Sequence, residues 1–471
     1  MNLTKISIKN LFGQYDHKIQ LKSEEGITII YGLNGVGKTT LLKLTNEALG
    51  SEVTDLIKTP FDNLELTFDN GNIMEITKKA KLLEEKNSEE QLSLALENKE
   101  FHIEELTNKN EESKIYYYLK NGEGDIIEQF SRVLKPPRRF RAIEIDEKLP
   151  FLRRVVRGVW RDTTDGQVYS LEDVEENFGH LIDPPNLPSW IENIHKAFHV
   201  HYIGANRLHG VGRILDDYLD NLKGILTPVV LLNSRELKRE IETNLASFAR
   251  VSQELERTFP NRLINRMITF KEDLVPHGEE IIDRLRKLEE RRTNLAKVSL
   301  LDSARDTTMN VPIEMSIEAG LDVHTRNVLE LYIEDTEEKL QELDGMESRL
   351  NLFVNILNKR LSSTKKRVFI DKEKGYCVTL PNGDEISLEK LSSGEQHEIV
   401  LLYDLLFRTT TGSLVLVDEP ELSLHITWQQ KFLEDVLEIA KLTGLKMLIA
   451  THSPDIISTR WDLTESLEEE L

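Results

Sequence analysis

The segment Gly32-Leu33-Asn34-Gly35-Val36-Gly37-Lys38-Thr39 decides the fold of this 471-residue chain. It matches the pattern G-x-x-x-x-G-K-[ST] in full. It lies between an apolar stretch at 26–31, which predicts a buried strand, and a helix expected over 38–49. Glycines let the backbone turn its N–H groups toward phosphates, which the N-terminus of a helix also attracts. The sequence therefore predicts a loop that binds ATP and Mg²⁺ through Asn34, Gly35, Gly37, Lys38, Thr39 and Thr40.

Two carboxylates end a second apolar strand. Leu414-Val415-Leu416-Val417 leads directly into Asp418 and Glu419. Many buried strands end in Asp, so this pattern alone is a weak signal. It indicates an ATPase site because the same chain also contains the phosphate-binding loop. We expect Asp418, with the Thr39 hydroxyl, to hold Mg²⁺, and Glu419 to act as general base on the attacking water.

A third motif, Leu391-Ser392-Ser393-Gly394-Glu395-Gln396, precedes an apolar helix. Ser392 and Glu395 have the spacing of a capping box, and hydroxyls and N–H groups at a helix start can bind an anion. Here the sequence resembles the LSGGQ-like signature of ABC-type ATPases, which include the SMC, RecF and OLD families. The resemblance implies that the signature of one subunit closes on the γ-phosphate held by another, through Ser392, Ser393, Gly394 and Glu395.

Two later loops gain a role from the same resemblance. Pro420-Glu421-Leu422-Ser423-Leu424-His425 is similar to the D-loop of OLD-like and RecF-like ATPases. Ala450-Thr451-His452-Ser453-Pro454 is similar to their switch loop, which implies that His452 contacts the γ-phosphate and senses hydrolysis.

The Q-loop and the adenine contact of this family have less direct counterparts. The family places a Gln after a strand, and the best candidate here is Asn206, which follows the stretch 200–203. Phe12 or Tyr15 either packs on adenine or belongs to the core. The sequence alone leaves both alternatives open.

The motifs imply that the two ends of the chain fold into one head, since Lys38 and Asp418 are 380 positions apart. The expected fold class is α/β: an ABC-type ATPase head with a parallel-sheet core, an antiparallel β subdomain and a helical or short coiled-coil insertion. Hairpins are expected around Asp69-Asn70-Gly71 and Asn121-Gly122. We expect four parts: 1–80, the N-terminal half of the head; 81–210, a β subdomain with a basic patch; 211–365, the helical insertion; and 366–471, the C-terminal half of the head.

Leucine spacing predicts helices over about 233–361. Apolar residues recur at 4-3-4-3 spacing within 281–295 and 329–361, which is typical of a coiled-coil seam. Two such arms would form an antiparallel hairpin, whose shorter arm reaches only about 30 Å at 1.5 Å per residue. An ordinary helical bundle is the alternative.

Composition limits the partners. With 60 basic and 82 acidic residues, the net charge of −22 does not draw the chain to nucleic acid. A local basic patch could bind DNA or an acidic partner; it comprises Arg132, Lys135, Arg138, Arg139, Arg141, Arg153, Arg154, Arg157 and Arg161.

A single cysteine, Cys377, fits a reducing cytoplasm. No apolar stretch approaches the roughly 20 residues of a membrane span, so we expect a cytoplasmic protein with no membrane role of its own.

The layout of the motifs resembles bacterial anti-phage ATPases of the PARIS kind, with Septu ATPases as near rivals. That resemblance implies an ATP-dependent dimer of heads, a possible higher homo-oligomer, and control of a nuclease toxin in response to a phage protein. Few residues follow the switch loop, so we expect the nuclease to be a separate chain. A RecF-like or SMC-like repair ATPase that binds DNA directly is the alternative. A transporter ATPase is disfavoured by the interrupted head.

Overall fold

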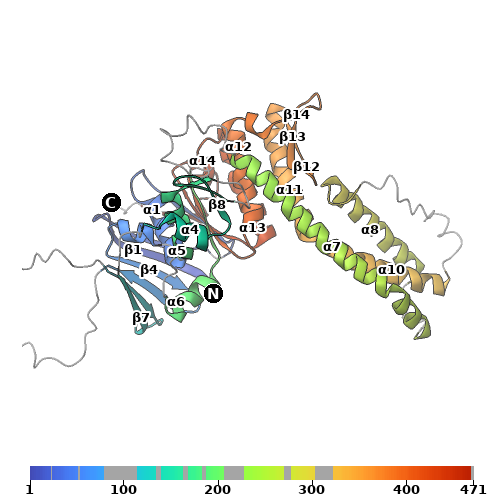
Figure 1. Ribbon diagram of the computed structural model, residues 1–471, viewed down its shortest axis with the longest axis horizontal. Helices are drawn as coiled ribbons and strands as arrows, with labels where there is room; N and C mark the ends of the chain where they lie inside the picture. Colours follow the sequence, from blue (N-terminus) through green and yellow to red (C-terminus); the bar gives the residue numbers. More distant parts are fainter. Residues whose placement is uncertain are drawn as a thin grey trace, which may run out of the picture.

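The computed structural model describes residues 1–22, 24–50, 53–78, 114–133, 139–162, 168–182, 187–205, 228–269, 277–302 and 322–467. These residues form an α/β head from which a helical arm extends (Figure 1). The predicted fold class, an α/β head with a parallel sheet and a helical insertion, is confirmed.

A parallel five-stranded sheet forms the centre of the head. Its strand order is β11-β15-β16-β3-β17, with bounds Val200–Ile203, Leu414–Asp418, Lys446–Thr451, Ile27–Tyr31 and Thr464–Ser466. Alternate residues of β15 enter different cores: Val415 and Val417 join one, Leu414 and Leu416 the other. The strand is therefore covered on both faces, which explains its continuous apolar sequence.

Helices cover this sheet on its two sides. α1 (Lys38–Leu49) follows the phosphate-binding loop and packs on β11, β15 and β16. α13 (Ile426–Thr443) belongs to the other core, through the predicted apolar face of Trp428, Phe432, Val436 and Ile439. α1 begins and ends where the sequence predicts, and Gly50 follows it in an extended conformation.

A six-stranded antiparallel sheet lies beside the parallel one. Its order is β2-β1-β4-β5-β6-β7, with bounds Tyr15–Gln20, Leu3–Leu11, Asn63–Phe68, Ile73–Thr77, Lys114–Lys120 and Ile126–Val133. Both predicted hairpins, β4–β5 and β6–β7, are confirmed. The sheet takes strands from both sides of residue 80, and the four-part division of the chain stays a prediction. The Glu-rich stretch 83–113 lies outside the described residues.

A small α/β module carries most of the described arginines of the sequence patch. Strands β8 (Leu152–Val156), β9 (Val159–Asp162) and β10 (Val168–Ser170) pack with α4 (Ala142–Lys148) and α5 (Leu171–Ile182). They enclose a separate core that contains Trp160. Two short helices complete this half of the head, α2 (Thr54–Lys58) and α6 (Ser189–Ala197).

The arm consists of α7 (Val229–Ile268), α8 (Gly278–Lys297) and α10 (Val323–Gln341). At 1.5 Å per residue, the 40 residues of α7 extend about 60 Å. The α8–α10 pair expected of a hairpin is present, and α7 packs on α10 as a third helix. The arrangement is closer to the bundle alternative than to a two-helix hairpin.

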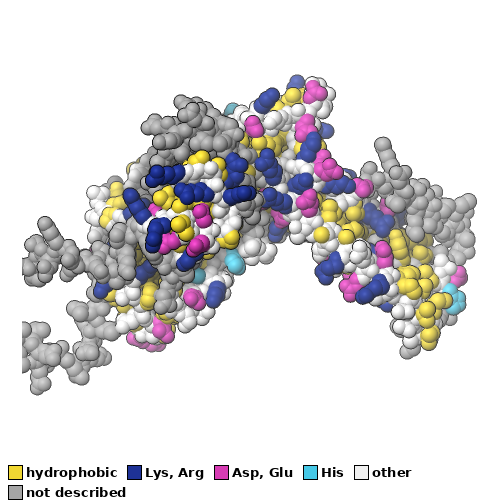
Figure 2. All heavy atoms as spheres, in the orientation of Figure 1, with side chains coloured by type: hydrophobic (Ala, Val, Ile, Leu, Met, Phe, Trp, Pro, Cys, Tyr) yellow, Lys and Arg dark blue, Asp and Glu magenta, His cyan; other side chains and the backbone are white. Residues whose placement is uncertain are grey.

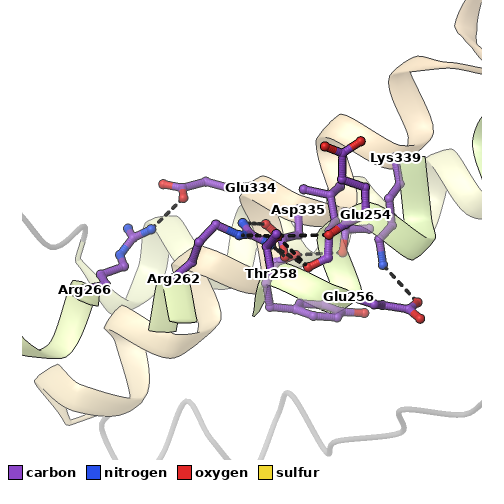
Figure 3. A network of polar contacts seen from close by, with 11 residues as sticks. Glu254, Glu256, Thr258, Arg262, Arg266, Glu334, Asp335 and Lys339 are labelled. Carbon is purple, nitrogen blue, oxygen red and sulfur yellow. Dashed lines mark hydrogen bonds and ion pairs between the residues drawn. The ribbon is translucent and has the colours of Figure 1, made fainter. Parts of the chain in front are cut away.

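Ion pairs join α10 to both neighbouring helices. Arg262 of α7 is bonded to Asp335, with 2.7 Å between Nη2 and Oδ2 (Figure 3). On the α8 side, Arg284 bonds to Glu330 at 2.5 Å and to Glu337 at 2.7 Å. Most of these side chains are partly exposed.

The chain returns to the head through α11 (Asp344–Leu361). The apolar spacing over 329–361 predicts one continuous helix, but α10 ends at Gln341 and α11 begins at Asp344. The break lets α10 pack on the arm while α11 packs on β12 (Arg367–Asp371), α12 (Ser393–Tyr403) and α13. Strands β13 (Gly375–Thr379) and β14 (Glu385–Ile386) complete a three-stranded sheet at the base of the arm.

Candidate functional site

The predicted motifs meet at one edge of the parallel sheet. The phosphate-binding loop follows β3, Asp418 ends β15, and His452 follows β16. Because the carboxyl ends of parallel strands share an edge, the order β15-β16-β3 gathers the three segments there. Segments that are distant in the sequence thereby become neighbours.

Two glycines shape the phosphate-binding loop. Gly35 and Gly37 have φ of 90° and 95°, which side chains of L-residues rarely adopt. A methyl group added at Gly37 would also lie 2.5 Å from Leu11 Cδ2, so the end of that side chain would have to move. Asn34 and Gly35 are exposed at the loop tip, and Thr40 is half-buried in the first turn of α1.

Lys38 is buried beneath this loop. Its Nζ donates to the carbonyl oxygens of Gly32 at 2.7 Å and Leu33 at 2.8 Å. The ammonium thus lies at the loop, and binding to a phosphate would exchange these carbonyls for phosphate oxygens. The opposite side of the loop is supported by His17, whose Nε2 lies 2.8 Å from the Val36 carbonyl oxygen.

Thr39 and Asp418 are in direct contact. Thr39 Oγ1 donates to Asp418 Oδ1 at 3.0 Å, and the Tyr202 hydroxyl donates to Oδ2 at 3.3 Å. Burial raises the pKa of Asp418, while the two hydrogen bonds lower it. Burial and the Asp418 charge raise the pKa of Tyr202, so its phenol keeps the donated proton. A carboxylate beside a hydroxyl is the oxygen donor set that Mg²⁺ prefers, and these residues fit that ion.

Glu419 has an unusual backbone conformation. Its φ is +43°, and its N–H donates to the Ala450 carbonyl oxygen at 2.9 Å. Backbone strain of this kind costs on the order of 1–3 kcal/mol and tends to occur at functional sites. The carboxylate is partly exposed, and its Oε1 lies 3.9 Å from His452 Nδ1.

The signature segment begins α12 as predicted. Ser392 is the N-cap: its Oγ accepts from Glu395 N–H at 3.4 Å, and Glu395 Oε2 accepts from Ser392 N–H at 2.9 Å. Glu395 is buried and pairs with Lys366 at 2.7 Å, so it supports the motif from inside. Ser392 and Ser393 are exposed. A methyl group at Gly394 would lie 2.7 Å from the Ser423 carbonyl oxygen, which places the signature against the turn after β15.

Sequence reasoning missed Tyr202, Glu421 and His17 as parts of this site. Tyr202 lies on β11, the strand predicted to precede the Q-loop, but Asn206 lies outside the described residues. Among the aromatic candidates, Tyr15 is half-buried and stacks on His17 with 5.8 Å between ring centroids. Phe12 is 42% exposed and lies beside Gly37, at the loop.

The arginine patch lies on the small module of α4, β8 and β9 (Figure 2). Its exposed members are Arg139, Arg141, Arg153, Arg154, Arg157 and Arg161. Arg132 is half-buried on β7, and Lys135 and Arg138 lie outside the described residues. Val155 and Val156 on β8 are 41% and 48% exposed, so the surface is apolar as well as basic.

Among the described residues, no helix is both long and apolar enough to span a membrane.

Two solved SMC heads resemble the chain weakly. One is the Smc head domain with an extended coiled coil bound to the C-terminal domain of ScpA, derived from Pyrococcus furiosus. The match has 12% identity and a TM-score of 0.31, and covers 97% of this chain and 90% of that one. The other is the SmcHead bound to the C-winged helix domain of ScpA. That match has 11% identity and a TM-score of 0.32, and covers 97% of this chain and 91% of that one. Scores this low do not establish a shared fold by themselves.

Two domain families and one characterised relative match parts of the sequence. Residues 239–457 match the AAA ATPase domain, and residues 27–166 match the AAA domain described as putative AbiEii toxin, Type IV TA system. The probable ATPase of retron Vc95 from Vibrio cholerae serotype O1 biovar El Tor is 31% identical over 93 residues. That match spans 17% of this chain and only 18% of the relative. Two separate stretches of the chain are therefore similar to AAA ATPase domain families.

Proposed function

We propose that this chain is an ABC/SMC-like ATPase that binds Mg²⁺-ATP at the carboxyl edge of the parallel sheet and hydrolyses it. The supporting observation is the 3.0 Å hydrogen bond from Thr39 to Asp418, which joins the phosphate-binding loop to a strand 379 positions away. In this proposal the loop from Asn34 to Thr40 binds the phosphates. Thr39 and Asp418 hold Mg²⁺, and Glu419 acts as general base with His452 beside it.

Substitution of Glu419 separates binding from turnover. Glu419→Gln keeps the shape of the side chain but removes the base, so turnover should fall by about 10²- to 10⁴-fold. Its affinity for ATP should stay within a few-fold of the parent protein. Lys38→Ala should instead lose ATP binding, measured by titration with a fluorescent ATP analogue. Unchanged turnover in Glu419→Gln, or unchanged affinity in Lys38→Ala, would refute the assignment.

We propose further that each active site is completed by the signature segment of a second subunit. Ser392 and Ser393 are exposed at the start of α12, and the buried Glu395 fixes Ser392 through two hydrogen bonds, so both hydroxyls are accessible to another subunit. Ser392→Arg should bind ATP without turnover. Mixing it with Lys38→Ala should restore activity, because one composite site then contains both intact halves. A mixture as inactive as its components would argue against sites shared between subunits.

We propose a separate effector, a nuclease toxin, as the protein that this ATPase controls in anti-phage defence, with a phage protein as trigger. Two resemblances support this: the family described as putative AbiEii toxin, and the retron ATPase. Affinity purification of the chain expressed with its neighbouring reading frames should yield the effector bound to a homo-oligomer of heads. Cells that carry the pair should resist phage, and Glu419→Gln should abolish that resistance. A chain that purifies alone and gives no protection would disprove the role.

The arginine patch bears on the alternative of a DNA-repair ATPase. Exposed Val155 and Val156 beside Arg153 and Arg154 favour a protein surface, since phosphates offer valine no apolar contact. Duplex DNA should therefore bind weakly at physiological salt. Tight DNA binding that falls steeply with salt and is lost in Arg153→Glu/Arg154→Glu would favour the repair alternative.

A further inference from the structure

A carboxylate with no assigned role lies next to His452. Glu421 follows Glu419 by two positions in the turn after β15, and its side chain is 5% exposed. Its Oε1 accepts from Thr451 Oγ1 at 2.7 Å and from the His452 backbone N–H at 3.0 Å. The same oxygen lies 3.1 Å from His452 Nδ1. Thr451 is the last residue of β16, and His452 is the first residue of the loop that follows it.

The distances decide which carboxylate orients the imidazole. Glu421 is within hydrogen-bond reach of Nδ1, whereas Glu419 Oε1, at 3.9 Å, is too far. A carboxylate that faces Nδ1 favours the tautomer with the proton on that nitrogen, and it fixes the plane of the ring. Nε2 is then left as the nitrogen available to other groups.

The rest of the Glu421 side chain has no competing task. Its Oε2 is buried and makes no hydrogen bond within the part of the chain that is described. A buried carboxylate is costly unless it is well bonded, and charge-assisted hydrogen bonds are the strong ones. The hydrogen bonds of this group are therefore directed at the loop that carries His452.

We propose that Glu421 is a positioning residue of the ATPase. It fixes the tautomer and the ring orientation of His452 and ties the loop after β16 to the turn that carries Glu419. This inference rests on the proposed function, in which His452 and Glu419 act on the same nucleotide. It assigns the Nδ1 side of His452 to Glu421 and leaves the Nε2 lone pair as a hydrogen-bond acceptor, for an O–H donor at the nucleotide such as the attacking water.

The surrounding contacts allow the role to be tested without loss of the fold. Ser453 Oγ donates to Gln429 Oε1 at 2.8 Å, and Gln429 Nε2 donates to the Leu424 carbonyl oxygen at 3.0 Å. The loop after β16 thus has a second anchor on α13. Glu421→Gln keeps the size of the side chain and removes only its charge, so we expect the variant to fold.

The first measurement needs no nucleotide. In the full chain labelled with ¹⁵N-histidine, the His452 signals, identified by their loss in His452→Gln, should be those of a ring protonated on Nδ1. In Glu421→Gln they should shift toward the other tautomer. Identical His452 signals in the two proteins would overturn the proposal.

The second measurement is steady-state hydrolysis. Glu421→Gln should lower kcat by about 10- to 100-fold, as is typical when a group that orients a histidine is removed, with the KM for ATP changed by less than about threefold. Thr451→Val is the matched control, since it removes another donor to Glu421 and leaves Nδ1 in place. If Glu421 were only a structural anchor, both variants would lose activity equally.

The outcomes separate the two proposals. A parent protein that binds or hydrolyses no ATP defeats the proposed function, while the His452 tautomer still reports whether Glu421 orients the ring. An active parent whose kcat is unchanged in Glu421→Gln leaves the ATPase assignment standing and overturns the role of Glu421.

Discussion

Charged side chains are used differently in the head and in the arm. At the base of the head, Arg360 of α11 is 4% exposed and pairs with Asp435 of α13, which is 14% exposed. In the arm, Arg266 and Glu334 are 28% and 47% exposed and join neighbouring helices. Buried charges are costly unless each is paired, whereas exposed pairs contribute little. The contacts of Arg360 therefore hold α11 against the head, whereas the ion pairs of the arm adjust a packing that apolar residues already provide.

The two regions meet at Arg360. Its side chain is 4% exposed, donates to the Trp428 carbonyl oxygen at 3.2 Å, and lies 3.7 Å from Glu398 of the signature helix α12. The helix that returns from the arm is thus anchored to α12 and α13 by a buried cation. This comparison predicts that equivalent substitutions have much larger effects in the head.

The largest effect is expected at the phosphate-binding loop. Gly37→Ala introduces both an unfavourable φ and a clash with Leu11, so affinity for an ATP analogue should fall by at least about 100-fold. Gly35→Ala is the matched control: its φ is also positive, but no atom lies within 4 Å of the added methyl. The affinity of Gly35→Ala for the ATP analogue should fall by about tenfold. Equal losses of affinity in the two variants would show that the contact with Leu11 does not contribute to the effect of Gly37→Ala.

The next effect concerns the anchor between arm and head. Arg360→Met keeps the length of the side chain but removes the cation beside the buried Glu398 and the partly buried Asp435, which should cost about 3–5 kcal/mol of unfolding free energy. Urea unfolding followed by intrinsic fluorescence would measure the change. A loss of unfolding free energy below about 1 kcal/mol would show that Arg360, with Glu398 and Asp435, stabilises the fold no more than an ion pair of the arm does.

The local motifs made most of the head predictable. Each motif is contiguous in the sequence. The apolar strands that precede the phosphate-binding loop and Asp418 are buried on both faces, so their sequences identify them as strands without knowledge of their neighbours. Tyr202 could not be found in this way. It is 216 positions from Asp418, and only the pairing of β11 with β15 brings the two together.

Glu421 and the arm escaped prediction for a related reason. The role of Glu421 depends on the loop after β16, whose position follows from sheet order and not from spacing along the chain. In the arm, leucine spacing identifies the apolar face of each helix but not which helix covers it. The packing of α7 on α10 and the break before Asp344 therefore emerge only in the structure.

The smallest effect is expected within the arm, where a double-mutant cycle on Arg262 and Asp335 gives the sharpest measurement. Asp335 is 8% and Arg262 33% exposed, and the guanidinium binds the carboxylate through two nitrogens, so the coupling energy should be about 1 kcal/mol. The more exposed pair Lys339–Glu256, at 3.4 Å, should give at most about 0.5 kcal/mol. High salt should weaken the second pair more than the first, because screening acts mainly on solvated charges. A coupling energy of about 3 kcal/mol between Arg262 and Asp335 would equal the effect expected at Arg360. It would contradict the proposed difference between the ion pairs of the arm and those of the head.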